Sequence, residues 1–231
     1  MYYAVIGDIV HSKDINHAVR NDVQKKLKMI LDGINKQFGK DIAAKFIVTI
    51  GDEFQGLINN PMVVLSIVDT IRYKMYPVII RFGIGIGGID TEINKEMALG
   101  ANGPAYHNAR NMVDHIKLLE KGKLSPSANI LFMSSWKEHN NIISLMNNNL
   151  QLCAFIESKW TDKQRDLVER MFLGGKNQTE AAAELGIAQS SVQRRLKSAG
   201  YYDYMYARDI ISVTLNGLSG EAVRVPVSSS H

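Results

Sequence analysis

Apolar residues gather in short runs along the N-terminal half of the chain, and most of these runs lead into glycine. The runs are residues 2–10 (YYAVIGDIV), 46–56 (FIVTIGDEFQG), 78–88 (VIIRFGIGIGG) and 129–133 (NILFM). A short apolar run that ends in a Gly-Asp pair is typical of a buried strand entering a tight turn. The pattern predicts a sheet with a hairpin at residues 46–56. The glycines of the third run would let a neighbouring backbone or a ligand approach closely.

Helical periodicity separates these runs. Residues 16–38, 61–74 and 105–119 carry apolar side chains three or four positions apart, which places them on one face of a helix. An Asn-rich stretch follows at residues 140–149. It contains four apolar residues that favour a further helix, namely Ile142, Ile143, Leu145 and Met146.

The pattern changes near Trp160, and the remaining sequence predicts a helical unit. We place the boundary near residues 147–150, which gives domains at 1–148 and 149–231, with residues 151–158 as a connecting helix. Beyond this unit, residues 201–215 carry apolar and aromatic side chains suited to one more helix. We expect that helix to support dimer contact, and the protein to be a homodimer.

Three short helices are expected between the connecting helix at residues 151–158 and the helix at residues 201–215. A capping box at residues 161–164 begins the first helix, residues 177–180 begin the second, and Gly186 makes the turn to the third at residues 189–198. An Ala-rich helix, a turn with glycine and a basic helix together form the signature of a helix-turn-helix. Helical trios of this size also occur as dimerisation or packing modules.

The composition is typical of a globular protein. The 231 residues are 45% hydrophobic, and we find neither a signal peptide nor a run long enough to cross a membrane. The single cysteine, Cys153, excludes an internal disulfide framework and fits a reducing compartment. The net charge of +4 permits nucleic-acid binding without arguing for it. We therefore expect a cytoplasmic globular protein with no membrane partner.

Two aspartates follow glycine near the ends of predicted strands, as Gly7-Asp8 and Gly51-Asp52. If the two strands are neighbours, Asp8 and Asp52 lie side by side. Paired carboxylates are the arrangement that holds Mg²⁺, because the ion takes hard oxygen ligands and keeps waters for substrate phosphates. The expected cofactor is therefore Mg²⁺ at Asp8 and Asp52. An ordinary hairpin turn also accounts for the second pair, since Gly-Asp is good turn chemistry.

These motifs resemble known families. The order of the two Gly-Asp pairs and RFGIGIG is similar to that of nucleotidyl cyclase and GGDEF-type catalytic domains, over roughly the first half of the chain. With GDIVHSK, GDEFQG and RFGIGIG, the whole chain resembles the SatD family of bacterial proteins. The resemblance implies an α/β (α+β) fold class, with a ferredoxin-like, nucleotidyl-cyclase-like mixed sheet and flanking helices. An all-α helix-turn-helix domain completes the expected fold.

The cyclase resemblance also implies a nucleotide site, with two departures from the family pattern. The implied nucleotide-binding residues are Gly7, Ser12, Lys13, Gly51 and Arg110. Alignment on Ala109 puts His107 and Asn111 at the positions of the ribose-binding Asn and the transition-state Arg, and leaves Arg110 about 100° around the helix. Val48 stands in place of the adenine-selecting Lys. We therefore expect catalysis to be slow or absent, or to use a substrate other than ATP. Glu53 is expected to play a secondary part and to pair with a neighbouring basic group.

The third helix of the C-terminal unit resembles the DNA-binding helices of sigma-factor region 4 and related regulators. It has no acidic residue. Glutamine and arginine suit base edges, whereas serine and lysine suit phosphates. The expected DNA-binding residues are Gln189, Ser190, Ser191, Gln193, Arg194, Arg195 and Lys197.

These observations favour a cytoplasmic regulator, in which Mg²⁺ and a nucleotide ligand at Asp8 and Asp52 modulate binding to double-stranded DNA. One alternative is an enzyme that makes or breaks a phosphoanhydride or a cyclic nucleotide and is targeted by its helix-turn-helix. A second alternative is a degenerate scaffold that only dimerises. The enzyme needs a positive group for developing charge, for which Lys13, Arg81 and Arg110 are the candidates.

Overall fold

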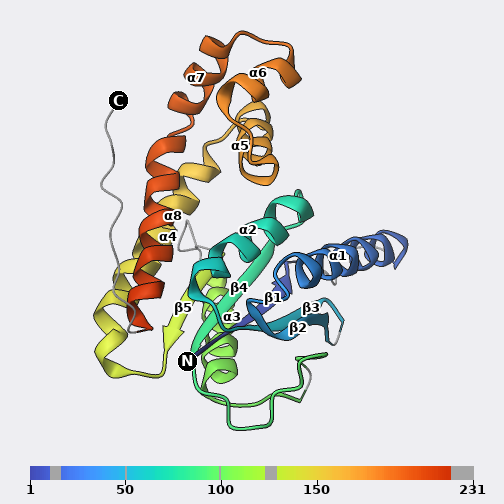
Figure 1. Cartoon of the computed structure of the whole chain (residues 1–231), viewed down its shortest axis with the longest axis vertical. Coiled ribbons are helices and arrows are strands. Elements are labelled where there is room, and N and C mark those ends of the chain that lie inside the picture. The colour runs from blue at the N-terminus through green and yellow to red at the C-terminus, as the bar shows by residue number, and fades with distance from the viewer. Residues whose placement is uncertain (11–16, 50, 99, 123–128, 220–231) are drawn as a thin grey trace.

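The structure is a computed structural model that describes residues 1–10, 17–49, 51–98, 100–122 and 129–219. A five-stranded sheet forms its N-terminal part, in the spatial order β2-β3-β1-β4-β5. β4 and β5 are parallel, and the other neighbours are antiparallel. The strands are β1 (Tyr2–Ile9), β2 (Ile42–Val48), β3 (Glu53–Ile58), β4 (Ile80–Gly87) and β5 (Ile130–Ser134). The predicted mixed sheet and the predicted hairpin, formed by β2 and β3, are thus confirmed (Figure 1).

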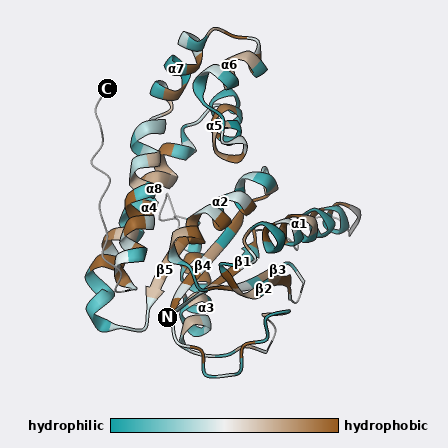
Figure 2. Ribbon diagram, in the orientation of Figure 1, coloured by the Kyte–Doolittle hydropathy of each residue, from teal (hydrophilic) through white to brown (hydrophobic). Residues whose placement is uncertain are grey.

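Helices cover both faces of the sheet. α1 (His17–Gln37), η2 (Pro61–Val63) and α2 (Val64–Met75) belong to one side, and α3 (Pro104–Lys121) lies on the other. Because alternate residues of a strand point to opposite faces, Tyr3 and Val5 pack with α1 and α2, whereas Ala4 and Ile6 pack with α3. Figure 2 shows the hydrophobic residues concentrated along the strands, between these helix layers.

α3 lies directly on β4 because alternate residues of that strand are glycines. A Cβ added at Gly83 would lie 1.9 Å from the carbonyl oxygen of Ala109, and one added at Gly85 would lie 1.9 Å from that of Ala105. The predicted close approach is therefore confirmed, and the approaching group is the backbone of α3. This contact fixes how the side chains of α3 meet the ends of the central strands.

Gly85→Ala is expected to destabilise the fold by at least about 1–3 kcal/mol, because a helix backbone must move to make room for one methyl group. Gly88→Ala is the matched control, since a Cβ at Gly88 meets no atom within 4 Å. Urea unfolding of both variants measures the difference. Equal midpoints for the two variants would show that α3 does not rest on β4 as described.

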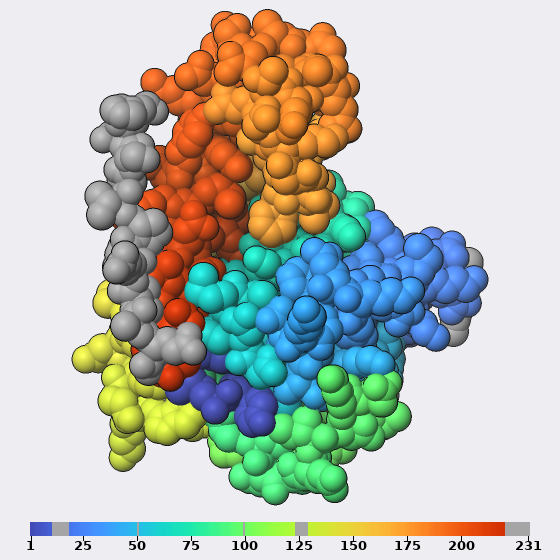
Figure 3. Space-filling view, viewed as in Figure 1, coloured from blue at the N-terminus to red at the C-terminus, as the bar shows by residue number. Residues whose placement is uncertain are grey.

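The C-terminal part is helical and projects from one end of the sheet (Figures 1 and 3). Its elements are η3 (Lys137–His139), α4 (Asn140–Ser158), α5 (Asp162–Gly174), α6 (Gln178–Leu185), α7 (Gln189–Ser198) and α8 (Tyr201–Leu218). The predicted helix starts are confirmed, because Thr161 and Asn177 form capping boxes at α5 and α6. Gly186 ends α6 with a φ of 62°, a left-handed conformation that favours glycine. Val192 and Leu196 of α7 are buried in the small core that these helices share.

Two long helices join the helical part to the sheet. α4 runs without a break through residues 148 and 149, where the boundary was expected, so the helix expected at 151–158 is the second half of one longer helix. α8 returns toward the sheet and places Ile211 and Leu215 in the core shared with α1 and α2. The helix expected at residues 201–215 is confirmed and packs on its own chain, while the homodimer stays a prediction. Among the described helices, none has both the length and the apolar character needed to span a membrane.

Candidate functional site

A charged cluster at the ends of the central strands is the first candidate site. The strand register sets Asp8 of β1 opposite Glu53 of β3 and opposite Arg81 of β4. Residues directly opposite one another point to the same face of a sheet. That face is the one covered by α3, because Ile6, two positions before Asp8, packs with α3. The cluster therefore forms where α3 crosses the strand ends.

α3 supplies the partners of these side chains. Asp8 accepts hydrogen bonds from Arg81 Nη1 at 2.6 Å and from Lys117 Nζ at 3.0 Å. Arg81 also donates from Nε to Glu120 Oε1 at 2.9 Å. Burial alone would lower the pKa of Arg81, but its hydrogen bonds to Glu120 and Asp8 raise it above its usual value. Asp8 and Arg81 are thus held in a network that is complete without a ligand.

Glu53 accepts hydrogen bonds from both terminal guanidinium nitrogens of Arg110 of α3, as expected for a carboxylate beside a basic group. This hydrogen bonding raises the pKa of Arg110. The Arg110 side chain keeps 40% of its surface exposed, so it remains accessible from solvent. Arg110 is therefore the member of the cluster best placed to meet an anionic ligand.

Packing and turn geometry account for the two glycines of the predicted site. Gly7 leaves room for the ring of Phe54, whose Cζ would lie 2.1 Å from an added Cβ. Gly51 sits in the hairpin turn with a φ of 73°, a left-handed conformation that favours glycine. Ser12 and Lys13 fall outside the described residues.

Asp52 lies in the hairpin turn, on the side of α1. Its carbonyl accepts a hydrogen bond from Ile9 N at 3.3 Å, which agrees with the expected neighbourhood of the two strands. Its Oδ1 lies 4.0 Å from Arg20 Nη2 of α1. Asp8, by contrast, contacts Lys117 of α3 on the opposite face. The register explains the difference, because a shift of one residue along a strand turns a side chain to the other face.

The donor set at these aspartates does not fit Mg²⁺ in this arrangement. Both carboxylate oxygens of Asp8 already accept hydrogen bonds from cations, so a shared ion would have to displace Arg81 or Lys117. Nowhere in the described ranges do three or more His, Cys, Asp or Glu side chains gather to hold a metal ion. Binding of Mg²⁺ at Asp8 and Asp52 stays a prediction that requires this network to open.

A polar cavity of about 310 Å³ lies beside Arg110. It is lined by Ile6, Gln55, Ala101, Asn102, Tyr106, His107, Arg110 and Asn111. Tyr106 is only 6% exposed, and its buried hydroxyl has no hydrogen-bond partner within the described ranges. Burial raises the pKa of this hydroxyl, which therefore stays protonated. A ligand in the cavity could accept its hydrogen bond and contact Arg110.

Several of these residues were not predicted from the sequence. Lys117 and Glu120 lie about two and three turns after Arg110 on α3, and this helical spacing is the signal that could have indicated them. Tyr106 carries no such signal, because its importance comes from an unpartnered hydroxyl in a cavity. The sequence did identify His107 and Asn111, by resemblance, and both line the same cavity.

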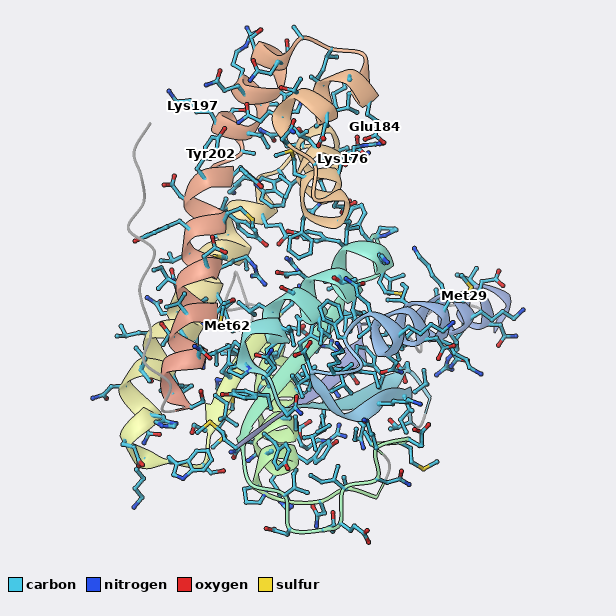
Figure 4. All side chains as sticks on the ribbon, viewed as in Figure 1. Met29, Met62, Lys176, Glu184, Lys197 and Tyr202 are labelled. Carbon is cyan, nitrogen blue, oxygen red and sulfur yellow. The ribbon has the colours of Figure 1, made fainter. Side chains whose placement is uncertain are left out.

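The outward face of α7 is the second candidate site. Val192 and Leu196 are fully buried beneath it, so the opposite face turns to solvent. Exposed on that face are Gln189, Ser190, Gln193, Arg194 and Lys197, while Ser191 and Arg195 are half-buried. Arg195 donates to the carbonyl of Lys163 at 3.4 Å. Lys197 projects outward in Figure 4, on the side away from the Lys176–Glu184 ion pair.

Comparison with known proteins gives a match to a protein family. The model of the SatD family matches residues 2–215. One similar solved structure is the catalytic core of a rhodopsin-guanylyl cyclase with converted specificity, in complex with ATPαS. It is 19% identical, with 49% of this chain and 71% of that chain covered and a TM-score of 0.33. Another is the guanylate cyclase domain of RhGC from Catenaria anguillulae in complex with GTP, at 18% identity, the same coverage and a TM-score of 0.32. No curated protein matches the sequence.

Proposed function

The chain belongs to the SatD family, and we propose that this member binds double-stranded DNA through α7 and acts as a transcriptional regulator. The observation that carries the proposal is the exposed face of α7. Five polar side chains lie along it, and the helix has no acidic residue to repel phosphates. A helix of this kind fits the major groove, where side chains at its exposed positions reach base edges.

The chemistry of these side chains assigns their roles. Arg194 can donate two hydrogen bonds to guanine and Gln193 can form two with adenine, so these two residues read bases. Ser190 and Lys197 contact phosphates and position the helix, because a lysine is a point charge without the planar fork of arginine. Specificity therefore resides in the centre of α7, and affinity is shared with its ends.

Selection from a random pool of duplexes tests this function. We expect the purified protein to enrich a defined motif at low salt, because base contacts distinguish sites that phosphate contacts bind equally. A pool that shows no enrichment after selection would contradict sequence-specific regulation. It would leave α5, α6 and α7 as a packing module.

A second function is favoured by the unpartnered hydroxyl of Tyr106 beside Arg110. We propose that the polar cavity binds the phosphate-bearing part of a nucleotide, with Arg110 as its cationic contact and Tyr106 as a hydrogen-bond donor. Cavities of a few hundred Å³ are typical of small-molecule sites. In this role the sheet part is a sensor, and it needs no catalytic group.

Nucleotides should raise the melting temperature of the protein, because a ligand that binds only the folded state stabilises it. Arg110→Gln is expected to remove the response to ATP and GTP. Lys121→Gln, an exposed cation near the end of the same helix, is expected to retain it. If Mg²⁺ binds Asp52, then Asp52→Asn loses only the magnesium-dependent part of the shift.

The same titrations, followed for product, separate the alternatives. An unchanged melting temperature with every nucleotide would contradict the sensor and support the dimerisation scaffold. Brisk conversion of ATP to cyclic AMP would overturn the expectation of slow or absent catalysis and support the enzyme. A shift without product is the result that we expect.

A further inference from the structure

A second cavity, of about 380 Å³, lies between the sheet part and the C-terminal helices. Its walls come from α2, the starts of β4 and β5 with the residues before them, α4, α5 and α8. Most of the lining is apolar, and includes Ile80, Ile130, Leu150 and Ala154. A ligand in this cavity would contact both the sheet part and the C-terminal helical part, to which α7 belongs. Its size and apolar lining are typical of a small-molecule site.

One side of this cavity is cationic. Arg72, Arg165 and Arg208 all line it, and each is largely buried, with 14%, 16% and 6% of its side-chain surface exposed. Two carboxylates pair with these arginines. Asp69 accepts from Arg208 Nη2 at 2.6 Å and from Arg72 Nη2 at 3.0 Å, and Glu157 accepts from Arg165 Nη1 at 2.7 Å and also pairs with Arg72.

Three guanidiniums thus pair directly with two carboxylates, of which Glu157 also lines the cavity, so the directly paired groups leave one positive charge in excess. Burial would raise the pKa of Glu157, but Arg72 and Arg165 lower it to about 2. This carboxylate is therefore ionised and is one of the two included in the count above. Glu169 of α5 lies near Arg165 and Arg72, but among the described residues it forms no direct ion pair with either and does not line the cavity. A buried charge without a counter-charge is unfavourable.

Hydrogen-bonding capacity is also left over in this cluster. Arg72 Nε is buried and has no partner among the residues that the structure describes. Arg72 donates its other hydrogen bonds to Glu157, Asp69 and the hydroxyl of Tyr204. A guanidinium that lacks one partner and belongs to a cluster of excess positive charge suits a carboxylate.

We propose that this cavity binds a small organic carboxylate with an apolar body. The carboxylate lies against the arginines, where it can accept the hydrogen bond of Arg72 Nε, and the apolar body fills the space beside Ile80, Leu150 and Ala154. Inorganic phosphate does not fit as well, because it would leave the apolar walls uncovered. The inference does not depend on DNA binding, since it concerns ligand binding to the chain alone.

Phenylacetate and its neutral amide, phenylacetamide, test the proposal on the full chain. The two probes share a shape and differ in charge. Phenylacetate at about 10 mM is expected to raise the melting temperature by roughly 2–6 °C, as for a ligand at about tenfold its Kd. Phenylacetamide is expected to leave it unchanged, because it brings no negative charge.

Variants locate the binding. Ala154→Phe fills the cavity and is expected to abolish the phenylacetate shift, and Arg165→Gln removes one cation and should reduce it. Arg170→Gln is the matched control, because Arg170 lies on the same helix but pairs with Asp166 and Glu184 outside the cavity. The proposal is overturned if phenylacetate gives no shift, if the amide shifts the protein equally, or if both Ala154→Phe and Arg165→Gln respond as the native chain does.

Discussion

Asp69→Asn is expected to destabilise the protein by about 3–5 kcal/mol, which is typical of removing one partner from a buried ion pair. Asp69 of α2 is 3% exposed, and Arg208 of α8 is 5% exposed. The carboxylate accepts two hydrogen bonds from Arg208, at 2.9 and 2.6 Å. The substitution preserves shape but leaves the guanidiniums of Arg208 and Arg72 without their shared counter-charge. The loss of stability is large because those charges stay buried.

The same substitution at an exposed pair provides the control. Asp166 pairs with Arg170 on the surface of α5, with 47% of the aspartate side chain exposed. Asp166→Asn is expected to change the free energy of unfolding by less than about 1 kcal/mol, because solvent screens such pairs. Urea denaturation with an unchanged m-value measures both variants. If Asp69→Asn and Asp166→Asn both reduce the free energy of unfolding by similarly small amounts, the Asp69–Arg208 ion pair does not hold α8 against α2.

The second large effect concerns DNA. Arg194→Ala is expected to cost about 1–3 kcal/mol at one base position, because the variant loses both hydrogen bonds to the guanine. If the protein is the homodimer that the sequence predicts, two copies of α7 contact the duplex, so the substitution counts twice and costs about 2–6 kcal/mol in total. Competition between the selected duplex and its single-base variants measures this loss.

Lys176→Ala is the matched control for this experiment. Lys176 belongs to the same helical unit but pairs with Glu184, on the side away from Lys197 (Figure 4). We expect the DNA affinity and the base preference of the Lys176→Ala variant to equal those of the native chain. If Arg194→Ala keeps the native preference at every base position, then Arg194 does not read the sequence.

Local signals in the sequence predicted much of the fold. Apolar runs located the strands, and the capping residues Thr161 and Asn177 located the starts of α5 and α6. The alternate glycines of β4 predicted a close approach, which α3 makes at Gly83 and Gly85. Such features depend on neighbouring residues only, so they can be read without knowledge of the rest of the chain.

Features that depend on register and distant packing could not be predicted in this way. Which carboxylate faces Asp8 is decided by a single residue of register, and the structure places Glu53 opposite it. Arg208 and Asp69 are separated by 139 positions and meet only because α8 folds back onto α2. The unbroken α4 was missed as one element because its asparagines suggested a boundary, although Asn147 in fact points to β5 and hydrogen-bonds both backbone groups of Phe132.

The central claim is that α7 binds DNA, and the salt dependence of duplex binding tests it most directly. The account predicts measurable binding at low salt that weakens as salt rises, since log K falls by about 0.9 per phosphate contacted for each unit of log salt. Lys197→Ala should reduce that slope by about one unit and weaken all duplexes alike. No binding to any duplex at low salt, or a slope unchanged by Lys197→Ala, would contradict the claim.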